Sequence, residues 1–118
     1  MLLKSFNYFA FRAVLPYEVR VGSGLRLWHR GLGVVVHPNT VIGKNVSVAH
    51  GVTIAGTPSG TTYIGDNVTI GAGAQIIPKK MRPYVIGEGA IIGAGSTVVG
   101  DVPAGSIARG DAARIYSA

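Results

Sequence analysis

Residues 64–76 read IGDNVTIGAGAQI, with aliphatic residues returning every six positions at Ile64, Ile70 and Ile76. Glycine follows the first two, and a small or β-branched residue lies four positions after each of them. A six-residue unit is too short for a pair of helices, so this pattern indicates a short strand followed by a bend. Repetition of such a unit indicates a solenoid, in which each coil packs on its neighbours.

The same six-residue repeat continues in both directions, from Val21 to Val98. Most steps are six residues, but three extra residues separate Leu27 from Val36, and two later steps carry four extra. Three units close one triangular coil of about 18 residues, and coils stack about 4.8 Å apart, the spacing of paired strands. We therefore predict an all-β protein, a parallel β-helix of about four triangular coils with the first aliphatic of every unit inside. The units sort into three faces that begin at Val21, Ile42, Ile64 and Ile86; Leu27, Val48, Ile70 and Ile92; and Val36, Ile54, Ile76 and Val98.

The extra residues fall between units, so we expect them to form outward loops at roughly 31–35, 57–63 and 78–85. Loops on a rigid scaffold commonly carry binding groups.

The β-helix is predicted to span residues 15–103. Residues 1–14 place apolar side chains at helical spacing and predict a short helix that caps the open end of the solenoid. Lys4 and Arg12 leave open a peripheral membrane contact through this helix. Residues 104–118 do not follow the six-residue repeat and are predicted to form a C-terminal cap or tail.

Composition narrows the range of partners. The 118 residues allow one domain, 47% hydrophobic content argues for an ordered chain despite 18 glycines, and the absence of cysteine excludes disulfides and thiolate metal sites. A formal charge of +6 favours anionic partners such as phosphates, acidic glycans or a membrane surface. The Lys and Arg residues are scattered without a recognition motif, which argues against nucleic acid as a partner.

No apolar stretch is long enough to span a bilayer, and no signal-peptide cleavage site follows the N-terminus. We therefore expect a cytoplasmic protein.

Register places four residues in one predicted column. Two positions after the start of each second-face unit come His29, His50, Ala72 and Ala94. Because adjacent coils are about one strand spacing apart, the two histidines are expected to lie within contact distance. At least one of the two rings should be neutral, because two cationic rings would repel. A neutral imidazole can act as a general base. His37, which is followed by Pro38 in an expected bend, is expected to be structural or incidental rather than catalytic.

The stretch 25–56, LRLWHRGLGVVVHPNTVIGKNVSVAHGVTIAG, resembles the hexapeptide-repeat acyltransferases, in particular their serine O-acetyltransferase and polysaccharide O-acetyltransferase branch. GDNVTIGAGAQII, GEGAIIGAGSTVV and the terminal ARI extend the resemblance over about residues 14–116. It implies that the β-helix is left-handed, an exception to the usual right-handed crossover. It also implies that His29 is the catalytic base, that acetyl-CoA is the acyl donor and that the protein is a homotrimer with active sites between subunits.

The resemblance further assigns the backbone contacts of the pantetheine arm to Gly56, Ala72 and Ala94. The basic residues Lys79, Lys80, Arg109 and Arg114 could pair with the coenzyme A phosphates. No metal is expected.

Three positions depart from the family. The aspartate that orients the base corresponds to Val14, so Glu18, the nearest carboxylate, is the candidate to replace it. A second histidine corresponds to about Thr61, and His50 takes the place of a common glutamine, which assigns it to the acceptor pocket. These changes leave a sugar hydroxyl open as the acceptor beside serine.

Rival interpretations make different predictions. A zinc-dependent γ-class carbonic anhydrase shares the fold and also uses three histidines, but the spacing of His29, His37 and His50 lacks that family's close pair. An ice-binding solenoid would present flat rows of threonine, which this chain does not have. A non-catalytic scaffold solenoid remains the other alternative.

Overall fold

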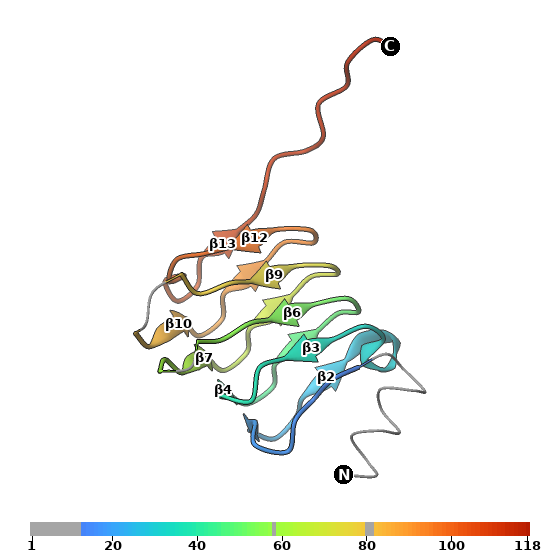
Figure 1. The fold of residues 1–118 in the computed structure, drawn as a ribbon. Helices are drawn as coiled ribbons and strands as arrows, with labels where there is room; N and C mark the ends of the chain where they lie inside the picture. The colour runs from blue at the N-terminus through green and yellow to red at the C-terminus, as the bar shows by residue number, and fades with distance from the viewer. Residues whose placement is uncertain (1–12, 58, 80–81) are drawn as a thin grey trace.

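The computed structural model describes residues 13–57, 59–79 and 82–118. Short parallel strands stack in three sheets around a central axis, and the C-terminal tail runs away from the last coil (Figure 1). The fold is the expected left-handed parallel β-helix. Its elements are β1 (Arg20–Val21), β2 (Arg26–Leu27), the 3-10 turn η1 (Trp28–Gly31), β3 (Val35–Val36), β4 (Thr40–Ile42), β5 (Ser47–Val48), β6 (Thr53–Ile54), β7 (Thr62–Ile64), β8 (Thr69–Ile70), β9 (Gln75–Ile76), β10 (Tyr84–Ile86), β11 (Ile91–Ile92), β12 (Thr97–Val98) and β13 (Ile107–Ala108).

The predicted register is confirmed on all three faces. The sheets run β1-β4-β7-β10, β2-β5-β8-β11-β13 and β3-β6-β9-β12. Each first aliphatic pairs with the one predicted for the next coil, for example Val48 with Ile70 and Ile70 with Ile92. Their side chains form one continuous core, in which Ile70, Ile76 and Ile86 are fully buried.

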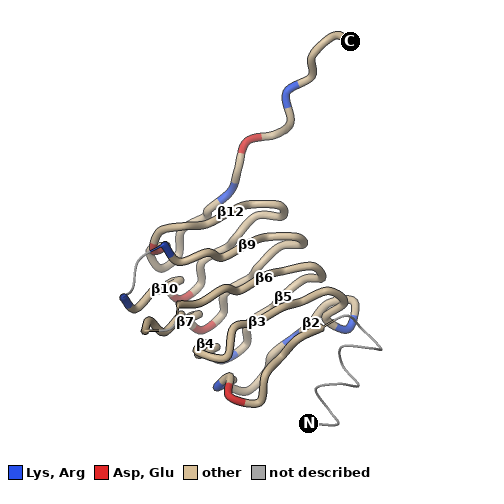
Figure 2. The backbone as a smooth tube through the Cα atoms, in the orientation of Figure 1, with Lys and Arg blue, Asp and Glu red and all other residues tan. Residues whose placement is uncertain are grey.

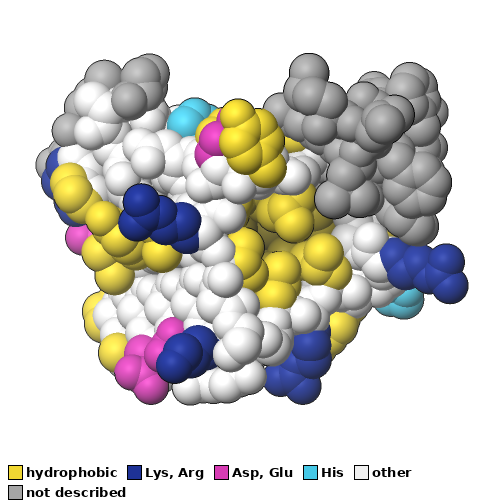
Figure 3. All heavy atoms as spheres, turned by 90° about the horizontal axis from the view of Figure 1, so that it is seen from below, with side chains coloured by type: hydrophobic (Ala, Val, Ile, Leu, Met, Phe, Trp, Pro, Cys, Tyr) yellow, Lys and Arg dark blue, Asp and Glu magenta, His cyan; other side chains and the backbone are white. Residues whose placement is uncertain are grey.

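The first coil departs from the prediction that every starting aliphatic is inside. Val21 keeps its register with Ile42 but is 40% exposed, because β1 is the edge strand of its sheet and pairs on one side only. Seen end-on in Figure 3, hydrophobic side chains gather at the centre of this end of the coil. Leu15, Leu25 and Leu27 are the partly buried residues that pack on the core here.

The C-terminal boundary of the coil also differs. Val102 forms a parallel bridge with Ile86, and β13 pairs with β11, so the solenoid continues through Ala108 rather than ending at residue 103. The step from Ile86 to Val102 breaks the earlier spacing and hides this partial coil in the sequence. Beyond it, residues 109–118 are exposed, as expected for a tail.

The N-terminal helix predicted for residues 1–14 lies outside the described residues, except at its end. There, Val14 is already part of the solenoid, because its N–H donates to Val34 O (2.7 Å) and its carbonyl accepts from Val36 N (2.9 Å). Within the described ranges no helix is long and apolar enough to cross a membrane.

The first outward loop lies earlier than predicted. Its extra residues are in η1, whereas Val35, predicted as loop, is in β3. The two later loops end sooner than predicted, because β7 begins at Thr62 and β10 at Tyr84.

Candidate active site

The corner between the second and third sheets carries the predicted histidine column. At this corner Gly73 N donates to His50 O (3.0 Å), and Gly95 N donates to Ala72 O (2.8 Å). His50, Ala72 and Ala94 therefore follow one another on successive coils, as predicted. Gly51 and Gly73 have φ near +69° and +68°, a left-handed conformation that glycine adopts without steric cost.

The backbone of the first coil places Leu32, not His29, beneath His50. Gly51 N donates to Leu32 O (2.8 Å), which repeats the bond pattern of the coils above. His29 lies three residues earlier, in η1, where the backbone loops outward. The predicted backbone column is therefore corrected at its lowest position.

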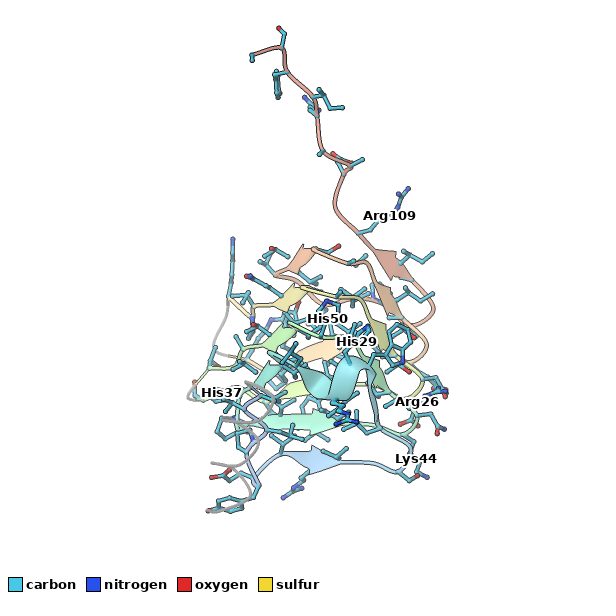
Figure 4. All side chains as sticks on the ribbon, turned by 90° about the vertical axis from the view of Figure 1, so that its right-hand side faces the viewer. Arg26, His29, His37, Lys44, His50 and Arg109 are labelled. Atoms are coloured by element: carbon cyan, nitrogen blue, oxygen red, sulfur yellow. The ribbon has the colours of Figure 1, made fainter. Side chains whose placement is uncertain are left out.

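The side chain of His29 nevertheless reaches the column. Its ring centroid is 5.0 Å from that of His50, and the two ring planes are almost perpendicular, at 85°. Figure 4 shows the two side chains next to each other, with His37 on another part of the coil. The loop thus restores the contact between the two imidazoles that the register predicted.

Local bonds hold η1 in this shape. Leu32 N donates to His29 O (3.2 Å), and Val34 N donates to Gly31 O (3.0 Å). Gly31 is buried at φ +69°, and a Cβ on it would lie 3.1 Å from Leu27 Cδ1. His29 and Arg30 have φ of 52° and 58°, so two consecutive side chains are held in a conformation that non-glycine residues seldom adopt.

Glu18, the candidate to orient His29, lies at a different corner of the coil from His29. It lines a groove of about 440 Å³ together with Arg20, Asn39, Thr61 and Tyr63, where the third sheet leads into the first. Asn39 joins two loops there, because its Oδ1 accepts from Thr61 Oγ1 (3.1 Å) and its Nδ2 donates to Gly60 O (2.9 Å). No hydrogen bond or ion pair links Glu18 to His29 in the part of the chain that the structure describes. No sequence motif singles out Asn39, and the spacing of the aliphatic residues does not indicate this groove.

Gly56 lies against His37 in a separate, mostly apolar groove of about 370 Å³ on the third sheet. A Cβ on Gly56 would be 2.4 Å from His37 Nδ1. That nitrogen already accepts from Asn39 N (3.0 Å), so the His37 ring takes part in a local hydrogen bond of the coil. The structure therefore supplies a packing reason for the glycine, apart from any contact with a cofactor.

The predicted phosphate-binding residues lie toward the last coils. Lys79 lines a cavity of about 220 Å³ with Arg82, Tyr84, Val99 and Gly100. Arg109, at the base of the tail, lines an adjoining groove that also includes Val99 and Gly100. Arg114 is exposed in the tail, and Lys80 lies outside the described residues. Figure 2 shows basic residues spread over the coil and the tail rather than gathered on one face.

A polar cluster missed by sequence analysis ties the third loop to the last coil. Asp101 accepts from Val85 N and from Arg82 Nη1, each at 3.0 Å, and Tyr84 OH donates to Gly100 O. The Val85 N–H, and then Arg82, hold the pKa of Asp101 below its ordinary value. Burial, reinforced by the charge of Asp101, raises the pKa of Tyr84 from 10.0 to about 12.

Comparison with known proteins agrees with this architecture. No protein-family model matches the chain. The soybean serine acetyltransferase apoenzyme superposes with a TM-score of 0.79 at 40% identity, covering 95% of this chain and 46% of that one. Serine acetyltransferase from Brucella abortus strain S19, solved with coenzyme A, gives a TM-score of 0.76 at 33% identity over 95% of this chain and 44% of that one. A 38-residue stretch is 53% identical to serine acetyltransferase 2 of Arabidopsis thaliana, covering 32% of this chain and 12% of that protein.

Repeat, register and fold define a hexapeptide-repeat β-helix protein. The chain is similar in sequence and structure to serine acetyltransferases, which are hexapeptide-repeat acyltransferases. It spans less than half the length of the solved relatives described above.

Proposed function

We propose that this chain is the catalytic β-helix of an acetyl-CoA-dependent O-acetyltransferase that acts on a hydroxyl of serine or of a sugar. The observation that carries the proposal is an exposed imidazole, His29, held beside a second imidazole on a solenoid similar to serine acetyltransferases, one of which was solved with coenzyme A. Serine is the first candidate acceptor, because the similar solved structures are named serine acetyltransferases. A sugar hydroxyl requires the same chemistry and is the second candidate.

In the proposed reaction, His29 accepts the proton of the acceptor hydroxyl as its oxygen attacks the thioester carbonyl. A new C–O bond forms, the carbonyl π electrons move onto oxygen, and backbone N–H groups stabilise this oxyanion. Collapse re-forms the carbonyl and breaks the C–S bond. The imidazolium of His29 then gives its proton to the departing thiolate, so the products are the acetyl ester and free coenzyme A.

The column above His50 suits the extended pantetheine arm. Ala72 and Ala94 have small side chains, which leave room beside the coil, and the proposal retains Gly56 as a further backbone contact. Lys79 and Arg109 are exposed near the last coils and are available to pair with phosphates. Arg114 and Lys80 are assigned to the same role on sequence alone. His50, in contact with His29, would face the acceptor.

We also propose a homotrimer. The groove that contains Glu18 and the ring of His29 belong to different corners of one subunit, so a single chain does not unite them. In a three-fold assembly, a corner of one prism can lie against its neighbour. A neighbouring subunit could then supply Glu18 and Asn39 to the pocket of His29.

The test is release of coenzyme A thiol from acetyl-CoA in the presence of serine, nucleotide sugars and oligosaccharides. His29→Ala should lower turnover by about 10²- to 10⁴-fold, the usual contribution of a general base, with the KM for acetyl-CoA little changed. Arg30→Gly is the matched control, since it alters the same loop without removing the imidazole. Wild-type turnover in His29→Ala would refute the assignment of the base. Absence of activity with every acceptor would favour the scaffold interpretation.

A further inference from the structure

We propose that His29 and His50 together form a two-histidine binding site for a divalent transition-metal ion, with Zn²⁺ as the probe. Metal binding at this site does not depend on the proposed transferase activity. Neutral imidazole is the commonest protein ligand for such ions and suits Zn²⁺, Cu²⁺ and Ni²⁺.

The separation of the two rings fits a shared ion. A Zn–N bond of about 2.1 Å, plus roughly 1.1 Å from nitrogen to ring centre, puts each ring centre about 3.2 Å from a bound ion. Two such arms at a tetrahedral angle of about 109° place the ring centres about 5.2 Å apart. The observed separation is 5.0 Å. The two rings are therefore at a separation that one ion bound by a nitrogen of each ring requires.

Both imidazoles are available for this role. His29 and His50 are exposed, and within the described ranges no hydrogen bond or ion pair occupies a nitrogen of either ring. His37 provides the contrast, since it is half-buried and its Nδ1 accepts from Asn39 N (3.0 Å). Two of the three histidines are thus free to ligate, and those two are adjacent.

The backbone presents the two rings to each other. His50 is fixed by the ladder that joins its carbonyl to Gly73 N. His29 is held with φ of 52° and is followed by Arg30 at 58°. Residues other than glycine adopt this left-handed conformation only at a steric cost, and such strain is concentrated at active sites and ligand clamps. With this backbone conformation the ring of His29 lies beside His50, although the backbone of His29 is outside the column.

The site would be open and exchangeable. Among the described residues no group of three His, Asp, Glu or Cys side chains is close enough to complete a protein cage. Two protein ligands leave the remaining positions to water, as in sites that bind metal reversibly rather than for structure. One consequence rests on the proposed function: a metal on His29 would occupy the lone pair that the base needs, and Zn²⁺ would then inhibit acetyl transfer.

Calorimetric titration of ZnCl₂ into the untagged, metal-free full chain tests the inference without any substrate. We expect one ion per chain, with His29→Ala and His50→Ala each weakening the affinity about 100-fold, because two linked ligands gain that order of avidity over one. His37→Ala is the control and should bind as the wild type does. Co²⁺ gives an independent readout, since its visible spectrum should lose its imidazole-dependent bands in the same two variants.

Failure to bind Zn²⁺ at millimolar concentration would overturn the proposal. So would wild-type affinity in His50→Ala, or an equal loss in His37→Ala. The binding result is independent of the transferase assay. Binding by a protein without acetyltransferase activity would leave the metal site standing while removing the proposed function.

Discussion

Replacement of Gly56 by alanine separates two reasons for the glycine at this position. An added Cβ would lie 2.4 Å from His37 Nδ1 and 2.6 Å from His37 Cγ, distances that real Cβ atoms do not adopt. The ring cannot move freely, because its Nδ1 accepts from Asn39 N and the His37 carbonyl accepts from Thr40 Oγ1 (2.6 Å). Overpacking typically costs about 1–3 kcal/mol. We therefore expect Gly56→Ala to lower the free energy of unfolding by about 2 kcal/mol.

Truncation of the ring should restore much of this loss. In Gly56→Ala/His37→Ala the contact that remains is with His37 Cβ, at 3.1 Å, which a shift of a few tenths of an ångström relieves. His37→Ala alone should cost about 1 kcal/mol for the lost bond to Asn39 N. Urea unfolding followed by circular dichroism gives all four corners of the cycle. A favourable coupling free energy of about 1–2 kcal/mol is expected, and strictly additive losses would refute the packing explanation.

The same four proteins separate packing from cofactor binding. If the Gly56 backbone also contacts the pantetheine arm, the double variant should recover stability but keep a raised KM for acetyl-CoA. If packing is the only reason for the glycine, stability and KM should recover together. A raised KM in a stable double variant would therefore assign Gly56 to the cofactor site.

Two further predictions concern stability. Because the folded protein raises the pKa of Tyr84 to about 12, it holds that proton more tightly than the unfolded chain does. The stability that comes from this shift should be fully present below pH 10 and lost as the pH rises toward 12. Urea unfolding should show that Tyr84→Phe lacks this loss. Parallel pH curves would contradict the effect. Ile70→Ala should cost about 2–5 kcal/mol because Ile70 is fully buried, whereas Ile91→Ala on the outer side of β11, at 45% exposure, should cost less than about 1 kcal/mol. Similar losses at both sites would mean that the core is not where the register places it.

The three faces of the solenoid followed from the spacing of aliphatic residues. Strand pairing requires that equivalent positions meet on every coil, and burial of one side chain in each pair leaves a single register that keeps Ile42, Ile64 and Ile86 inside. The same argument correctly aligned His50 with Ala72 and Ala94. These residues lie in regular coils, where counting along the chain is equivalent to measuring position in space.

The spacing of aliphatic residues could not predict the positions in space of the residues that interrupt the six-residue repeat. Between Leu27 and Val36, counting forward aligns His29 with His50, while counting back aligns Leu32, and both counts satisfy the strands on either side. The partial coil at Val102 and Ala108 was missed for a related reason, since its step differs from all earlier ones.

The amino-acid sequence by itself determined the triangular solenoid, its register and its aliphatic core, because a periodic pattern has only one way to bury one side of every strand. Tertiary structure alone decided that Leu32 continues the backbone column while the ring of His29 returns to meet His50. That outcome depends on the left-handed backbone at His29 and Arg30 and on the bonds that close η1. Such contacts depend on how an irregular segment folds over its neighbours, and no local period encodes them.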